Sequence, residues 1–184
     1  IDKNTLVVVD GAYMEYAQAQ DVSKKIDPKK IIEEYSNVIY LGTFSKAYGL
    51  GGMRVGYGVA DEKIIKELYK LRPPFNVTTL SLEAASVALS DEEFVNKSIA
   101  LNFQEMNRYK EFALEKKIDI IESYTNFVTF VFSETLNSSE IANQLLKKGM
   151  IVRDLSGYKM NAIRVTVGTS IQNSKLFELL EELL

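Results

Sequence analysis

The sequence predicts an α/β protein in two parts: a mostly parallel sheet in the first part and a small α+β unit in the second. Two observations carry this prediction. Before residue 90, an apolar strand, a capped helix and another apolar strand follow one another, an order typical of parallel sheets. After a long helical segment, short strands alternate with two further helices. We therefore expect units at residues 1–90 and 91–184.

Two strands open the first unit. Residues 5–9 form a β-branched run closed by Asp10, which is typical of a buried strand, and residues 38–41 form the next strand. Lys46 follows this second strand closely. Because ligands of parallel sheets collect at the carboxyl ends of strands, Asp10 and Lys46 stand where a ligand would bind.

The helix between these strands begins at Pro28, a residue suited to the first turn, with Asp27 as its N-cap. We expect three of its apolar residues to be buried: Ile31, Ile32 and Tyr35.

A glycine-rich segment from Gly49 to Gly58 follows, and its backbone must turn tightly or approach something closely. Residues 53–59 alternate enough to form a third strand. Asp61 is expected to cap a helix that ends at Leu71 before two prolines, and residues 79–89 form the next helix.

The second unit begins with a helix that Asp91 caps and that runs to about Lys117. Its expected buried residues are Phe94, Ile99, Leu101, Phe103 and Met106. The remaining elements are strands at 118–121, 127–132, 151–154 and 163–167, a helix at 138–148 that ends at Gly149, and a last helix from about 172.

Composition excludes several kinds of chemistry. The chain of 184 residues has no Cys and no His, which rules out thiol nucleophiles, Cys/His zinc sites and Ser-His-Asp triads within it. The composition therefore favours lysine, which reacts with carbonyls as a nucleophile, as the reactive group. We expect no metal site.

Charge indicates which partners the protein has. The net charge is −3, with 22 basic and 25 acidic residues and no block of either sign. This pattern argues against nucleic acid and membrane surfaces and favours small-molecule partners. The sequence shows no secretory signal, so we expect a cytoplasmic protein. Because Ile1 is followed almost at once by a strand, we also expect the C-terminal portion of a longer polypeptide.

Three fragments at strand ends carry the candidate chemistry: Asp10-Gly11-Ala12-Tyr13, Thr43-Phe44-Ser45-Lys46, and Gly49 to Gly56 with Arg54. They combine an acid, a phenol, hydroxyls, a lysine and an arginine, all of which a coenzyme with an aldehyde and a phosphate would use. Taken singly, each residue could instead be a cap or a solvated side chain. The glycines do not fit a dinucleotide fingerprint, because Arg54 occupies its last glycine position.

These fragments resemble the cofactor site of fold-type I pyridoxal-phosphate aminotransferases, specifically the histidinol-phosphate aminotransferase group. The shared features are Asp-x-x-Tyr, the serine before the lysine, and the lysine-to-arginine spacing of eight. Tyr124-Thr-Asn126-Phe127, Arg153 and the run from Ala162 to Thr169 extend the resemblance over nearly the whole chain. It implies the C-terminal part of a PLP-dependent transferase fold, of mostly parallel sheet, with a small α+β C-terminal domain. One departure is Gly11, where such enzymes commonly have Glu.

The resemblance implies a role for each candidate in coenzyme binding. Lys46 would bond to the coenzyme aldehyde and shuttle the proton, and Asp10 would hold the pyridine nitrogen protonated. Tyr13 would donate a hydrogen bond to the 3′-oxygen. Thr43 or Ser45, with Arg54, would hold the phosphate of pyridoxal 5'-phosphate.

The resemblance also implies a substrate site. Arg164 lies within the apolar run Ile163-Arg-Val-Thr-Val, where an inward-facing arginine needs an anion, and it would bind the substrate carboxylate. On an alternating strand it could equally face water. Arg153 and Asn126 are further substrate-binding candidates. The substrates would be an amino acid or amino phosphate and a 2-oxo acid, and the protein would be a homodimer.

The expected activity is amino transfer from histidinol phosphate to 2-oxoglutarate in histidine biosynthesis. Two alternatives within the same coenzyme class stay open, a threonine-phosphate decarboxylase and an aromatic aminotransferase. A third alternative is that the chain alone is a non-catalytic folding or interaction module.

Overall fold

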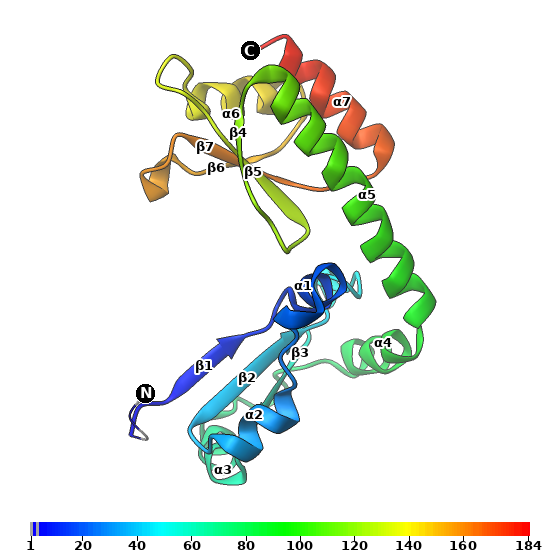
Figure 1. The fold of residues 1–184 in the computed structure, drawn as a ribbon. Helices are drawn as coiled ribbons and strands as arrows, with labels where there is room; N and C mark the ends of the chain where they lie inside the picture. The colour runs from blue at the N-terminus through cyan, green and yellow to red at the C-terminus, as the bar shows by residue number, and fades with distance from the viewer. Residues whose placement is uncertain (1, 3) are drawn as a thin grey trace. The chain divides into compact units, whose positions relative to one another are not determined.

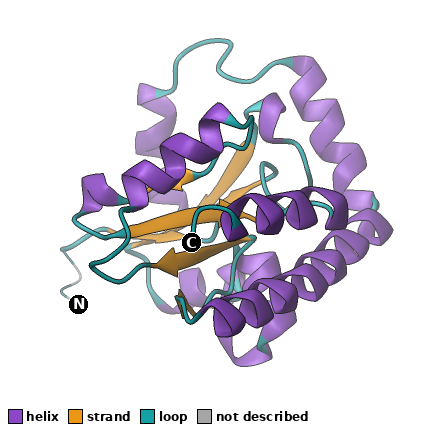
Figure 2. Ribbon diagram, turned by 90° about the horizontal axis from the view of Figure 1, so that it is seen from above, coloured by secondary structure: helices purple, strands orange, loops and turns teal. Residues whose placement is uncertain are grey.

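The chain folds into two compact units, and each is described here by itself. The computed structural model describes residue 2 and residues 4–184. The first unit ends at Lys97 and the second comprises Ser98–Leu184, so the boundary falls inside helix α5 (Glu92–Lys116), which runs unbroken through it (Figure 1). Both units combine helices with strands, drawn in purple and orange in Figure 2. The α/β fold class is confirmed.

The sheet of the first unit has three strands in the order β1-β2-β3. β1 (Val7–Asp10) pairs in parallel with β2 (Val38–Thr43), which confirms the predicted parallel pair. β3 (Gly56–Ala60) pairs with β2 in the antiparallel direction. Asp10 stands opposite Leu41 in the register, so β1 ends beside the last residues of β2.

Helices separate and follow the strands of this sheet along the chain. The first unit contains α1 (Met14–Gln20), the short 3-10 helix η1 (Val22–Lys24), α2 (Pro28–Glu34), the 3-10 helix η2 (Gly51–Met53), α3 (Glu62–Leu71) and α4 (Thr79–Ser90). α2 packs against β2 and β3. None of the helices of the described chain is long and apolar enough to cross a bilayer.

The predicted N-caps are confirmed. The carboxylate of Asp27 accepts hydrogen bonds from the amides of Lys29 and Lys30, and that of Asp61 accepts one from the amide of Lys63. These bonds satisfy amides that have no partner inside the helix, which fixes where α2 and α3 begin.

Several expectations for the first unit were wrong. β1 is an edge strand with Val8 54% exposed, so it is not the buried strand that its composition indicates. Tyr35 is also exposed, because α2 ends at Glu34 and Tyr35 is its C-cap. The third strand starts at Gly56, and Met53 belongs to η2. Helix α1 was not predicted, and its N-cap Tyr13 makes no side-chain capping bond.

The second unit is a four-stranded antiparallel sheet in the order β4-β5-β7-β6, with three helices. Its elements after α5 are β4 (Asp119–Ile121), β5 (Phe127–Val131), α6 (Ser138–Lys147), β6 (Arg153–Asp154), the 3-10 helix η3 (Ser156–Tyr158), β7 (Ala162–Thr166) and α7 (Ser170–Glu181). α5 and α7 lie side by side (Figure 1), joined by contacts such as the hydrogen bond from Arg108 to Ser174.

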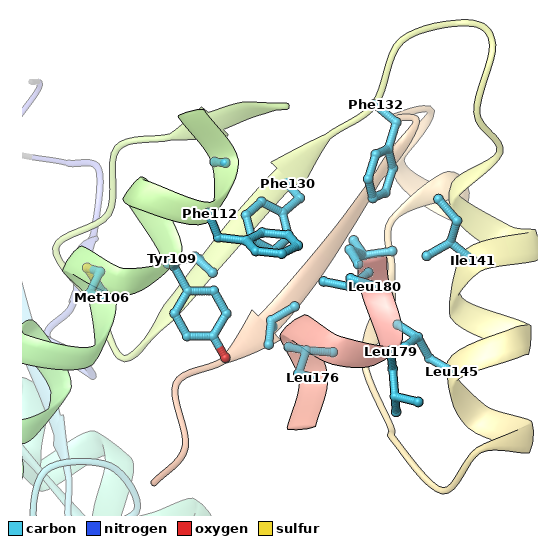
Figure 3. Packing of buried hydrophobic residues seen from close by; sticks show 14 residues of the cluster. Met106, Tyr109, Phe112, Phe130, Phe132, Ile141, Leu145, Leu176, Leu179 and Leu180 are labelled. Carbon is cyan, nitrogen blue, oxygen red and sulfur yellow. The ribbon is translucent and has the colours of Figure 1, made fainter. Parts of the chain in front are cut away.

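One apolar core holds the second unit together. Figure 3 shows the side chains that α5, β5, α6 and α7 contribute to it, which include Tyr109, Phe130, Leu145 and Leu180, all at 0% exposure. Met106 and Ile99 are buried on α5 as expected. Leu101 on the same helix, by contrast, is exposed.

Phe94, the other expected buried residue of α5 that is exposed, lies in the part of the helix that belongs to the first unit. Gly149 adopts a φ of 81° after the C-cap of α6, which confirms the predicted glycine stop.

Candidate functional site

The first group of candidates gathers where β1 and β2 end. The pairing of these strands continues one residue past β1, because the amide of Gly11 donates to the carbonyl oxygen of Leu41 at 2.8 Å. Asp10 Oδ1 accepts from the amide of Ala12 at 3.0 Å, which turns the chain towards α1. Tyr13 follows this turn, and the Lys46 ammonium lies 5.4 Å from the centre of its ring. Two segments far apart in sequence thus meet here.

The loop that carries Lys46 is anchored on both sides of it. Phe44 and Ala47 are buried, and the amide of Phe44 donates to the carbonyl of Val55 at 3.2 Å. The amide of Gly49 closes a turn on the carbonyl of Lys46 at 3.0 Å. Lys46 itself is half-buried. Its backbone is therefore fixed while its amine is left at the strand-end site.

Arg54 approaches Ser45 across this loop. Arg54 Nη1 donates to Ser45 Oγ at 3.4 Å and to the carbonyl of Gly51 at 3.0 Å. Its backbone is left-handed, with φ of 51°, a conformation that turns the chain back from η2 into β3. Thr43 Oγ1 accepts from the amide of Ser45 at 3.1 Å. A guanidinium and a hydroxyl thus stand together, which is a donor set suited to a phosphate.

Position 11 has no room for a side chain. A Cβ there would lie 2.2 Å from the hydroxyl oxygen of Tyr40 and 2.8 Å from the carbonyl oxygen of Leu41. Tyr40 is 2% exposed, so its ring cannot easily move away. The buried phenol of Tyr40 accounts for glycine at a position where the resembling enzymes commonly have Glu.

Tyr40 interacts electrostatically with two other phenols and with the carboxylates of Glu15 and Asp10. Burial raises the pKa of Tyr40 to about 12, with further contributions from Tyr57, Glu15, Tyr48 and Asp10. Glu15, on the first turn of α1, has its own pKa raised, because burial disfavours its charged form. Tyr40 and Glu15 lie outside the motifs, and this group of side chains was not predicted from the sequence.

The second group of candidates lies on the sheet of the second unit. Arg164 on β7 stands opposite Thr129 on β5 and opposite Arg153 on β6, so the two arginines are direct cross-strand neighbours. The guanidinium carbon of Arg164 lies 4.7 Å from the centre of the Phe127 ring, within range for a cation–π contact. The backbone carbonyl of Asn126, just before Phe127, accepts a hydrogen bond from the amide of Val167 at 2.9 Å.

Arg164 is half-buried rather than fully buried, and Arg153 is exposed. The reason is the alternation of β7: Ile163 and Val165 face the core and Arg164 faces the other side. Within the described part of the chain, neither guanidinium has a carboxylate at salt-bridge distance. Like charges directly opposite one another are unfavourable, so the pair is suited to an anion.

Comparison with known proteins identifies the family. The model of the family described as aminotransferase class I and II matches residues 1–183. The chain belongs to this family.

Two curated relatives of this chain are named histidinol-phosphate aminotransferase. The one from Sulfurimonas denitrificans is 71% identical over 97% of the chain and 49% of its own length, and the one from Aliarcobacter butzleri is 62% identical over 100% and 50%. The chain thus spans about half the length of the curated relatives it matches. It also resembles the histidinol-phosphate aminotransferase of Sinorhizobium meliloti, solved in complex with pyridoxal-5'-phosphate, with a TM-score of 0.87, 25% identity, and coverage of 100% of this chain and 51% of that one. The predicted family and fold are confirmed.

The sequence-derived candidates thus form two groups on this aminotransferase chain. Lys46, Asp10, Tyr13, Thr43, Ser45 and Arg54 belong to the first unit, and Arg164, Arg153 and Asn126 belong to the second. A cavity of about 450 Å³ lined by Val7, Ile31 and Val38, among others, lies at the start of β1 and β2, the opposite end from Lys46. The missed cluster around Glu15 had one sequence signal, the glycine directly after Asp10, because it indicated that another side chain fills this space.

Proposed function

We propose that the whole protein is a pyridoxal-phosphate-dependent aminotransferase that transfers the amino group of histidinol phosphate to 2-oxoglutarate in histidine biosynthesis. The observation that carries the proposal is the meeting of Lys46 with Tyr13 at the strand ends, next to Asp10, in a chain 71% identical to a relative of that name. Residues 1–90 would belong to the coenzyme domain and 91–184 to a small domain. A cytoplasmic homodimer fits the charge pattern and the family.

The side chains present fit the coenzyme. Its phosphate would be held by Arg54 and Ser45, which already lie together because Arg54 Nη1 donates to Ser45 Oγ, with Thr43 shaping the turn. Its phenolic oxygen would meet Tyr13, and its ring nitrogen would meet the Asp10 carboxylate. When bound, pyridoxal phosphate supplies an electron sink for the bonds of the substrate's α-carbon.

Each residue of the chain then has a definite task. The amine of Lys46 would take the proton from the substrate's α-carbon and deliver it to the carbon that carried the coenzyme's aldehyde, a task that in many enzymes falls to histidine, which this chain lacks. The Asp10 carboxylate holds a proton on a ring nitrogen, and its bond to the Ala12 amide fixes its orientation. Arg54 binds the phosphate dianion through several donors at once.

The paired arginines would bind the substrate's anionic group. Arg164 and Arg153 present two planar donor forks from neighbouring strands, an arrangement that suits a phosphate, and each fork alone suits a carboxylate. Stacking on Phe127 orients Arg164. An amino phosphate and a 2-oxo acid could use the same site in turn.

Labelling and product analysis together test the proposal. Borohydride reduction of the whole protein with pyridoxal phosphate should place the label on Lys46 in peptide maps, and Lys46→Ala should abolish it. Lys63→Ala, which removes an exposed lysine of the same unit, is the matched control. Product analysis should show 2-oxoglutarate consumed with histidinol phosphate. Carbon dioxide release from threonine phosphate would favour the decarboxylase alternative, and a label on another lysine would overturn the site.

A further inference from the structure

Helix α5 carries a row of polar side chains on the face that packs against the second unit. Asn102, Glu105 and Tyr109 are buried, and Glu105 is only 1% exposed. Their spacing of three and four residues places them on one side of the helix. A buried carboxylate is costly unless hydrogen bonds and opposite charge satisfy it, so the partners of Glu105 show what the row does.

Glu105 is satisfied by three donors. Arg108 Nη1 donates to it at 2.7 Å, Ser170 Oγ at 2.5 Å and Asn173 Nδ2 at 2.8 Å. Burial alone would raise the pKa of Glu105, but the bonds from Asn173, Ser170 and Arg108 outweigh it and hold the pKa below its usual value. The group is therefore an anion that ties α5 to α7.

Asn173 passes this connection on to the end of β7. Its Oδ1 accepts from the amide of Gly168 at 2.9 Å and from the Tyr109 hydroxyl at 2.8 Å. Its Nδ2 donates to the carbonyl of Gly168 at 3.0 Å as well as to Glu105. Both polar groups of Gly168 are thus clamped by one side chain, two residues after β7 ends at Thr166.

A second connection reaches the neighbouring loop. Asn102 Nδ2 donates to the carbonyl of Thr125 at 3.1 Å. The next residue, Asn126, is bonded through its carbonyl to the amide of Val167. Phe127 then begins β5 and carries the ring on which Arg164 stacks. The two loops flanking the Arg164 site are therefore bonded to one another and to one face of α5.

We propose that Glu105 and Tyr109, acting through Asn173, and Asn102, acting through the carbonyl of Thr125, are positioning residues that set Asn126 and Arg164 in the geometry needed to bind the substrate's anionic group. This inference rests on the proposed function for the identity of the substrate. It does not rest on it for the binding of an anion. Motifs could not reveal it, because the row touches no substrate and acts through backbone groups.

A charge exchange tests the proposal in the whole protein. Asn173→Asp places a second carboxylate beside Glu105, and Glu105→Gln leaves Arg108 without its anion. The double variant Glu105→Gln/Asn173→Asp again sets one carboxylate against one amide. We expect each single change to raise KM for the amino donor by about tenfold or more with a smaller change in kcat. The double variant should recover part of the loss but not all of it, because a carboxylate at position 173 cannot donate to the Gly168 carbonyl. Glu111→Gln, an exposed carboxylate of the same helix, is the matched control.

Two further readouts separate positioning from general stability and from the proposed function. Hydrogen exchange of the Gly168 amide should quicken in both single variants and slow part of the way back in the double variant, which keeps an acceptor for this amide but no donor for the Gly168 carbonyl. Affinity for inorganic phosphate, measured by calorimetry, should follow the same order. If the whole protein transaminates nothing, the proposed function fails, while phosphate affinity still decides this inference. If Gly168 exchange quickens and both KM and phosphate affinity stay unchanged, the positioning role is wrong.

A milder variant covers the case in which the single changes prevent folding. Tyr109→Phe removes one hydrogen bond to Asn173 and keeps the buried ring. It should raise KM by about two- to fivefold, because one ordinary hydrogen bond is lost. An unchanged KM with quickened Gly168 exchange would overturn the proposal here too.

Discussion

Arg153 and Arg164 should destabilise the fold in the absence of an anion. They stand directly opposite one another on β6 and β7, and neither has a carboxylate at salt-bridge distance within the described residues. The Cα atoms of directly paired residues on neighbouring strands lie about 5 Å apart, and two unit charges at that separation in a water-like medium repel by about 0.8 kcal/mol before salt screening. Arg153→Gln should therefore raise the free energy of unfolding of the whole protein by about 0.5 kcal/mol at low salt.

An anion should reverse this order. A ligand that binds only the folded state at a hundred times its dissociation constant adds about 2.7 kcal/mol to the free energy of unfolding. The wild-type protein should gain this increment in phosphate. Arg153→Gln, having lost one of two binding forks, should gain about 1 kcal/mol less at the same phosphate concentration.

Urea unfolding with and without phosphate, at constant ionic strength, measures both effects. Lys110→Gln removes an exposed positive charge from α5 and controls for the change in net charge. Phosphate that stabilised Arg153→Gln as much as the wild type would refute the anion site. A loss of stability in Arg153→Gln without phosphate would refute the repulsion.

Three further results are expected. Hydrogen bonds from Ser139 and Ser156 lower the pKa of Asp154 to about 2, so the stability that its carboxylate contributes is present above pH ~4 and lost as the pH falls through 2. Asp154→Asn should lower the free energy of unfolding by about 2 kcal/mol at pH 7 and make it less dependent on pH between 4 and 2. Asp10→Asn should keep some coenzyme but lose several orders of magnitude in turnover, because an amide cannot hold the ring proton; near-normal turnover would contradict its role. Arg164→Lys should lower kcat/KM for glutamate by roughly 30- to 1,000-fold and leave coenzyme binding intact; unchanged glutamate kinetics would contradict it.

Local signals predicted the helices best. α3 begins and ends where Asp61 and the following prolines indicate, since an N-cap bond and a proline act within a few residues. The same reasoning explains the omission of α1. Its N-cap Tyr13 makes no side-chain capping bond, so no local signal marks the start of this helix.

Burial was predicted less well than secondary structure. Phe94 and Leu101 fit the apolar pattern of α5 yet are exposed, as is Val8 in β1. A periodic pattern states which residues share a face, but what covers that face depends on segments distant in the sequence. The buried row of Glu105 was missed for the same reason, because two of the donors that satisfy this carboxylate, Ser170 and Asn173, lie 65 and 68 residues along the chain.

The residues of the candidate site also differ in how far local sequence features predict them. Lys46 and Asp10 stand out in the sequence because strand ends and motifs are local features, and the parallel register of β1 and β2 then brings their segments together. The pairing of Arg153 with Arg164 requires the antiparallel register of β6 and β7, which composition does not encode. Cross-strand charge pairs are therefore a property that the structure adds.

The contact between Gly11 and Tyr40 gives a last prediction about the strand-end site. A Cβ at position 11 would lie 2.2 Å from the hydroxyl oxygen of Tyr40, 2.3 Å from its Cζ and 2.8 Å from the carbonyl oxygen of Leu41. Because Tyr40 is 2% exposed, relief requires the backbone beside Asp10 to move. Gly11→Ala should therefore lower the free energy of unfolding by about 1–3 kcal/mol, as overpacking does.

A double-mutant cycle shows whether the phenol is the cause. Tyr40→Phe keeps Cζ and should not relieve Gly11→Ala, whereas Tyr40→Leu removes the ring and should recover about 1 kcal/mol of the loss, with the remainder due to the Leu41 carbonyl. Gly52→Ala, where nothing lies within 4 Å of the new Cβ, is the control and should change stability little. If Gly11→Ala were as stable as Gly52→Ala, the close approach of Tyr40 to the Asp10 turn would be wrong. The explanation for the glycine directly after Asp10 would then fail with it.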